Sequence, residues 1–157
     1  FAIPVYRYRA MIRKHFKVLI ISSSASMLVG VLSSWLLASL LNLDEIVKNS
    51  LLARSISIPF ALVLTEKIGG SISLIPLFTV ITGLVGMLFG DLLLLWMRYK
   101  HRIAHGAAFG NAAHAMGIAR ARQRHPEEGV IASLSMIISG IIMVLFAPAV
   151  IALINFI

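Results

Sequence analysis

Three long apolar segments constrain this chain more than any other feature of its sequence. Segments 18–41 and 129–157 contain no charged residue, and segment 72–97 contains only Asp91. A helix needs about 20 mainly apolar residues to cross the hydrocarbon core of a bilayer, which is about 30 Å thick. We therefore expect each segment to form a full transmembrane helix, and residues 1–157 to form one all-α integral membrane domain.

Composition and charge also indicate a membrane protein. Hydrophobic residues make up 59% of the chain and charged residues only 13%, which is unlike the balance in a soluble domain. The net charge of +8 comes from cations at the ends of apolar segments, where they anchor loops, and not from a nucleic-acid-binding surface. The absence of cysteine excludes disulfides and thiolate metal sites. The chain begins without methionine, so we expect it to be the later part of a longer protein.

Charge predicts the side of the membrane on which each loop lies. Five cations lie between residues 7 and 17, whereas the connection 42–49 carries two acids and one lysine. By the positive-inside rule the first is cytoplasmic and the second is outside, and the cationic loop 98–102 is cytoplasmic again. Segment 72–97 alone makes that return crossing. The segment 50–70 should therefore enter and leave the membrane on the same face.

Segment 50–70 carries its own signal for a break. Pro59 lacks an N–H and disfavours helix at the residue before it, so a helix here should stop near residues 57–59. Each resulting half is too short to span, which predicts a re-entrant hairpin, with a kinked single span as the alternative. Arg54 lies inside this segment, where it either contacts an anion or extends to the outer interface.

Segment 103–121 is the second unusual stretch. It places two histidines, an asparagine and three glycines among alanines, with cations before and after it. Both ends should thus be cytoplasmic, which again predicts a re-entrant hairpin, with its tip around Gly110 and Asn111. An amphipathic helix at the membrane surface is the alternative.

Segment 72–97 contains two further features. Gly83, Gly86 and Gly90 lie three and four residues apart, so they share one face and form a stripe for helix packing. Asp91 follows directly. A lone acid in a span is typical of a proton or ion path, but this one is close enough to the end of the segment to be an interfacial residue instead.

Two broken segments that enter from opposite faces are typical of the substrate site of a secondary transporter. Helix N-termini exposed by such breaks attract anions, and Arg54, His114 and Arg120 would add positive charge. We therefore expect a small organic anion as the substrate. No nucleophile motif or metal-ligand spacing occurs, so we expect neither an enzyme nor a cofactor.

Four ordered blocks of sequence carry a resemblance to a known family. They are RSISIPFALVLTEKIGG at 54–70, GLVGMLFG at 83–90, HGAAFGNAAHAMGIARA at 105–121 and EEGVIASLSMIISGIIMVLFAP at 127–148. Together they resemble the LrgB/CidB family of antiholin-like proteins, also called murein hydrolase export regulators. A similar domain occurs in the plastid glycolate/glycerate translocator. The chain departs from the family pattern at Ala113, Ile118 and Ile58, where the family has hydroxyl side chains.

The resemblance implies a multi-pass protein of the bacterial cytoplasmic (inner) membrane, with part of an inverted-repeat, transporter-like fold. It implies carriage of small monocarboxylates such as glycolate, glycerate or pyruvate, and a possible LrgA/CidA-type membrane partner. The alternative is an antiholin-like regulator of murein hydrolase activity and cell lysis, or a pore, that forms homo-oligomers through its glycine stripes. For a carrier, the expected substrate-binding residues are Arg54, Ser55, Ser57, Pro59, Gly110, Asn111, His114 and Arg120.

Overall fold

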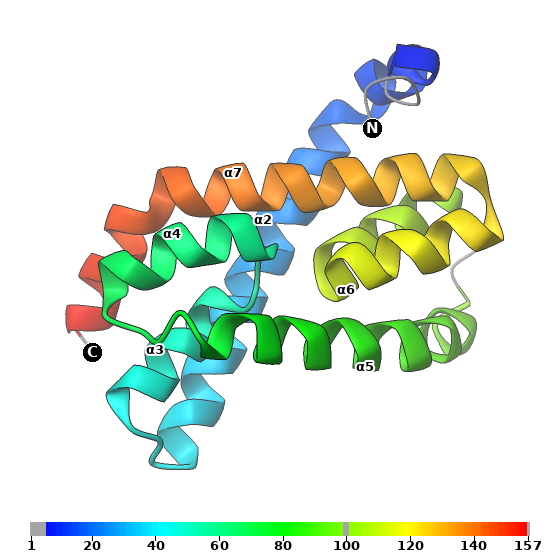
Figure 1. Cartoon of the computed structure of the whole chain (residues 1–157). Coiled ribbons are helices and arrows are strands. Elements are labelled where there is room, and N and C mark those ends of the chain that lie inside the picture. Colours follow the sequence, from blue (N-terminus) through cyan, green and yellow to red (C-terminus); the bar gives the residue numbers. More distant parts are fainter. Residues whose placement is uncertain (1–5, 99–100, 157) are drawn as a thin grey trace.

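The computed structural model describes residues 6–98 and 101–156 as a bundle of α-helices (Figure 1). The helices are α2 (Arg9–Leu40), α3 (Glu45–Ala53), α4 (Ile58–Ile68), α5 (Leu74–Trp96), α6 (Arg102–Arg124) and α7 (Pro126–Phe156). The described residues form no strand. Three of the helices, α2, α5 and α7, are long and apolar enough to cross a membrane. The expectation of an all-α membrane protein with three long apolar helices is therefore confirmed.

The break that Pro59 predicts lies between α3 and α4. Helix α3 ends at Ala53, Ser57 is extended with ψ 150°, and Pro59 occupies the first turn of α4, where a missing N–H costs nothing. Helix α4 then ends at Gly69, whose φ of +73° is easy for glycine. Helix α3 begins at Glu45, five residues before the expected start at 50, because the polar connection itself is helical.

Helix α6 reverses direction at His114, which has φ +50° and ψ −134°. The segments on either side form two arms, residues 102–113 and 115–124, that lie next to each other (Figure 1). His105 Nδ1 and Arg124 Nη2 are 2.9 Å apart, whereas a straight helix would separate these residues by about 28 Å. A Cβ on Gly117 would come within 2.1 Å of the Phe109 carbonyl oxygen, so the two arms are in close contact.

The reversal occurs three residues after the predicted tip, and that prediction was wrong for a reason of packing. A Cβ on Gly110 would lie 2.1 Å from the Ala132 carbonyl oxygen, so this glycine is needed for contact with α7. The side chain of Asn111 is committed to buried hydrogen bonds. His114 is the residue at which the chain turns instead.

Helix α6 packs between α5 and α7. The glycine stripe of α5 faces it: Cβ atoms added at Gly86 and Gly90 would lie 2.6 Å from Ala113 and 2.7 Å from Phe109. Gly83 is similarly close to Met116. The stripe therefore makes a helix contact within this chain.

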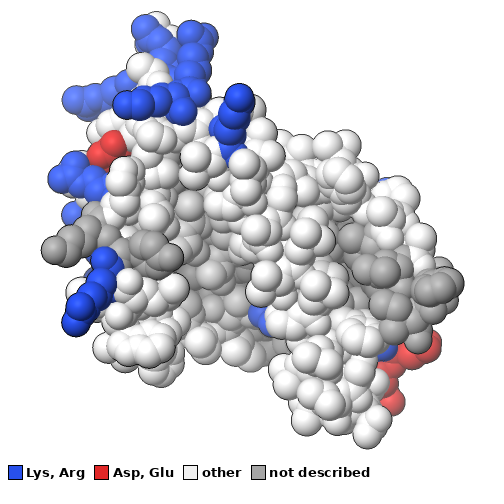
Figure 2. Space-filling model, turned by 180° about the vertical axis from the view of Figure 1, so that it is seen from behind, with Lys and Arg blue, Asp and Glu red and all other residues white. Residues whose placement is uncertain are grey.

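The outer surface is largely apolar between two charged ends. In the view of Figure 2, most of the lysines and arginines gather at one end, where one acidic patch lies among them, and further acidic residues lie at the opposite end, with mostly uncharged surface in between. Helices α2 and α5 supply much of this apolar surface, as shown by the exposed side chains of Leu32, Leu36, Leu88 and Leu92. Such a surface suits contact with lipid.

Candidate functional site

The break before α4 and the turn of α6 meet at a cavity of about 250 Å³, which we call the turn pocket. Helix α5 forms a third wall and Met136 of α7 completes the lining. The residues that line it are Ser57, Ile58, Pro59, Thr79, Val80, Gly83, Ala113, His114, Ala115, Met116 and Met136. Three residues expected to bind substrate, Ser57, Pro59 and His114, thus come together from two segments far apart in sequence.

His114 joins these two segments. Its ring is buried, with 4% of the residue exposed, and Nε2–H donates to the Arg54 carbonyl oxygen at 3.2 Å. Because a carbonyl can only accept, this contact requires the proton on Nε2. The positive φ of a non-glycine residue costs about 1–3 kcal/mol, so the surrounding packing must hold the turn in place.

The first turn of α4 presents partial positive charge to the turn pocket. Pro59 has no N–H, and the N–H groups of Phe60 and Ala61 each donate to the Ser57 carbonyl oxygen at 3.0 Å. Ser57 stands just before the helix, and its hydroxyl does not cap it. Together with the helix dipole, these groups favour an anion or a strong hydrogen-bond acceptor.

Arg54 lies outside the turn pocket. Its side chain is partly buried, and Nη1 donates to the Thr82 hydroxyl of α5 at 3.1 Å. It lines a separate cavity of about 450 Å³ together with Leu51 and Thr82. The backbone of Arg54, rather than its charge, contacts the turn of α6.

Asn111, Gly110 and Ser55 also lie elsewhere. Asn111 Oδ1 accepts from Ser139 at 2.7 Å and from Ser23 at 3.1 Å, which links α2, α6 and α7 through a buried polar contact. Gly110 packs against α7, and Ser55 lies against Gly30 of α2. None of these three residues lines the turn pocket with Ser57 and His114.

Arg120 and Asp91 are partners of each other. Arg120 Nε donates to Asp91 Oδ2 at 2.6 Å, and Arg124 also pairs with this carboxylate. Both arginines come from the second arm of α6, while Asp91 lies in the last turns of α5. This ion pair joins α5 to α6 at the cationic end of the molecule.

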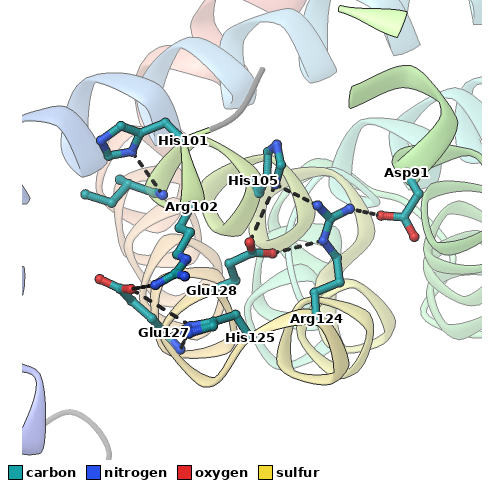
Figure 3. A network of polar contacts seen from close by, with 9 residues as sticks. Asp91, His101, Arg102, His105, Arg124, His125, Glu127 and Glu128 are labelled. Carbon is teal, nitrogen blue, oxygen red and sulfur yellow. Dashed lines mark hydrogen bonds and ion pairs between the residues drawn. The ribbon is translucent and has the colours of Figure 1, made fainter. Parts of the chain in front are cut away.

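The polar network continues from Arg124 into the interior (Figure 3). Arg124 Nη2 donates to His105 Nδ1 at 2.9 Å, and its Nε pairs with Glu128 at 3.2 Å. Near the surface, Arg102 pairs with Glu127 at 3.3 Å. The network holds both arms of α6 to the start of α7. We define Asp91, His105, Arg120, Arg124 and Glu128 as the end network.

The family can be decided from the whole sequence. The sequence model of the LrgB-like family matches residues 1–153. The chain belongs to the LrgB-like family. The resemblance seen in the four sequence blocks is thereby confirmed.

Several curated proteins are similar to this LrgB-like chain. YwbG of Bacillus subtilis is 31% identical over 148 residues, which cover 94% of this chain and 66% of YwbG. The holin-like protein CidB of Staphylococcus aureus is 33% identical over 158 residues, which cover 97% of this chain and 66% of CidB. A Haemophilus influenzae protein is 31% identical over 155 residues, which cover 99% of this chain and 67% of that protein. The chain thus spans about two thirds of the length of these relatives. No solved structure gives a significant match.

Sequence reasoning missed two groups of residues in this LrgB-like chain. Thr79 lines the turn pocket, and it lies four residues before Gly83, so its place on the glycine face of α5 was available as a signal. His105, Arg124 and Glu128 form the centre of the end network. The contacts of His105 with Arg124 and Glu128 depend on the reversal at His114, which no local pattern located, whereas Arg124 and Glu128 are only four residues apart in sequence.

Proposed function

We propose that this LrgB-like chain acts in the bacterial cytoplasmic membrane as an antiholin-like regulator of murein hydrolase activity and cell lysis. The observation that carries the proposal is family membership together with a relative, CidB, that is named a holin-like protein. Three helices suited to a membrane support the location. A smaller LrgA/CidA-type membrane protein and further copies of the chain are the expected partners. This role requires no catalytic residue and no cofactor.

Controlled expression tests this role. Lysis rate and released murein hydrolase activity are measured in a bacterium that lacks its own members of the family, with this protein expressed and with an empty vector. We expect expression to change both quantities in the same direction. Equal lysis rates and equal hydrolase activity in the two cultures would contradict a regulatory role.

A second candidate function is carriage of small monocarboxylates, and the turn pocket favours it. Helix α4 is about 16 Å long and each arm of α6 is about 15–18 Å long, so none of them spans a bilayer alone. We propose that α3–α4 and the two arms of α6 are re-entrant hairpins that enter from opposite faces. Their ends would then meet within the membrane, as the broken helices of transporters do. The substrate would occupy the turn pocket beside Ser57 and His114.

Uptake of labelled glycolate and pyruvate into proteoliposomes tests carriage. We expect uptake well above that of protein-free vesicles, and a fall of about tenfold or more in Ser57→Ala and His114→Ala. Ser57→Ala removes a hydroxyl at the pocket, and His114→Ala releases the turn from Arg54. Ser55→Ala is the matched control, since it removes a hydroxyl that lies outside the turn pocket. Uptake no faster than in protein-free vesicles would rule out carriage of these two acids and leave the regulatory role standing.

A further inference from the structure

We propose that Thr79 is a ligand-binding residue, and that the turn pocket binds short-chain monocarboxylates with a preference for those whose remainder is aliphatic over those whose remainder is hydroxylated. This inference rests on the carriage proposal, because it deepens the same site. The observation behind it is a buried hydroxyl without a partner at the wall of a cavity.

Thr79 is 6% exposed, and its Oγ1 has no hydrogen-bond partner among the described residues. A buried threonine on a helix can satisfy its hydroxyl by bonding to the carbonyl four residues earlier. Thr65 does so, with Oγ1 donating to the Ala61 carbonyl oxygen at 2.7 Å. Thr79 does not, although it lies inside α5. An unpaired buried hydroxyl is destabilising, so a partner supplied by a ligand would explain it.

The turn pocket gathers hydrogen-bond donors from separate elements. The Ser57 hydroxyl comes from the residue before α4, and the Thr79 hydroxyl comes from α5. Nε2 of His114 is already committed to the Arg54 carbonyl oxygen, so this ring fixes the position of the wall. Two hydroxyls and a helix N-terminus suit the two oxygens of one carboxylate.

The other walls determine what the rest of the ligand can be. They consist mainly of Ile58, Pro59, Val80, Ala113, Met116 and Met136. A ligand hydroxyl placed against these side chains would lose its water without gaining a partner, which disfavours binding. An alkyl chain has no hydrogen bonds to water to lose, so its burial against these side chains is favourable. Propionate and butyrate should therefore bind more tightly than glycerate, which has a hydroxyl on each of its two further carbons.

Thr79→Val tests the residue because valine keeps the shape of threonine and replaces only its hydroxyl, by a methyl group. The full chain in detergent is titrated with propionate while its melting temperature is followed, since a ligand that binds the folded state raises it. We expect Thr79→Val to melt no lower than the unaltered protein without ligand, and to bind propionate about tenfold more weakly. We also expect the unaltered protein to be stabilised at lower concentrations of propionate than of glycerate.

Two control variants separate ligand binding from structure. Thr65→Val removes a buried hydroxyl that is already bonded and lies outside the turn pocket, so it should lower the melting temperature and leave propionate affinity unchanged. Ser55→Ala removes another buried hydroxyl without a partner, also outside the turn pocket. It should melt no lower than the unaltered protein and bind propionate equally well.

The possible failures can be distinguished. If propionate stabilises the unaltered protein and Thr79→Val equally, Thr79 does not bind the ligand, while carriage through the turn pocket survives. Tighter binding of glycerate than of propionate would overturn the ligand class proposed here. If none of propionate, butyrate, pyruvate and glycolate shifts the melting temperature of the unaltered protein, both the carriage proposal and this inference are overturned.

Discussion

At the scale of single residues, the backbone of His114 carries a conformation that glycine would adopt without strain. Its φ of +50° costs about 1–3 kcal/mol, whereas glycine loses about 0.4–1 kcal/mol of stability through the greater freedom of the unfolded chain. Strain relief should outweigh that loss. We therefore expect His114→Gly to be more stable than His114→Ala by about 1 kcal/mol, measured by thermal unfolding in detergent. Both variants lack the imidazole, so equal stability, or a more stable alanine variant, would show that the turn is not strained.

The sequence indicated which residues come together where the residue type was exceptional in its surroundings, although their expected role in substrate binding stays a prediction. A proline or a histidine inside an apolar segment is rarely explained by packing alone. Ser57, Pro59 and His114 do line one cavity. Gly110 and Asn111 were assigned to a turn because both residue types favour turns. The structure uses the glycine for close packing and the asparagine for a buried contact, and only the tertiary neighbours could distinguish these uses.

At the scale of elements, the pairing of Asp91 with two arginines should fasten α5 to the second arm of α6. The carboxylate is 20% exposed, and its removal would leave Arg120 and Arg124 without this partner. We expect Asp91→Asn to lower the free energy of unfolding by about 1.5–3 kcal/mol, the range for hydrogen bonds to charged groups. Chemical or thermal unfolding in detergent measures this change. Whether Asp91 also carries a proton stays a prediction.

A matched control for Asp91→Asn is available at the same end of the molecule. Glu127 pairs with Arg102, whose side chain is 56% exposed. An exposed ion pair contributes about 0–1 kcal/mol, so Glu127→Gln should have a small effect. Equal losses in the two variants would mean that the Asp91 pair does not hold α5 to α6.

Sequence predicted the kinds of element better than their ends. Long apolar runs located α2, α5 and α7, but α2 begins at Arg9, nine residues before the expected start at 18. Arginine, lysine, alanine and methionine are all good helix formers, so a charged run does not end a helix. The two arms of α6 could be expected from charge at both ends, whereas the position of their turn depended on contacts with α7.

At the scale of the whole molecule, both proposed roles need the chain to sit in a bilayer with its cationic end in the cytoplasm. The apolar surface between the charged ends in Figure 2 agrees with insertion in a bilayer, and the positive-inside rule favours a cytoplasmic location for the cationic end. The glycine stripe of α5 is used inside the chain, so a homo-oligomer would have to form through another face. The central claim of the carriage proposal is more specific: the arms of α6 enter and leave on one side.

Labelling of single introduced cysteines is the most direct test of this topology, because the sequence contains no cysteine of its own. Exposed positions at the two ends of α6, Arg102 and Arg122, and near its turn, Ala115, are each changed to cysteine in sealed vesicles of known orientation. Glu45 and Lys67 serve as the corresponding positions at the ends of α3–α4. We predict that a membrane-impermeant reagent labels 102 and 122 only from the cytoplasmic side, labels 45 and 67 only from the outside, and does not reach 115 from water. Labelling of 102 and 122 from opposite sides, or full labelling of 115 from the cytoplasmic side, would show that α6 is not a re-entrant hairpin.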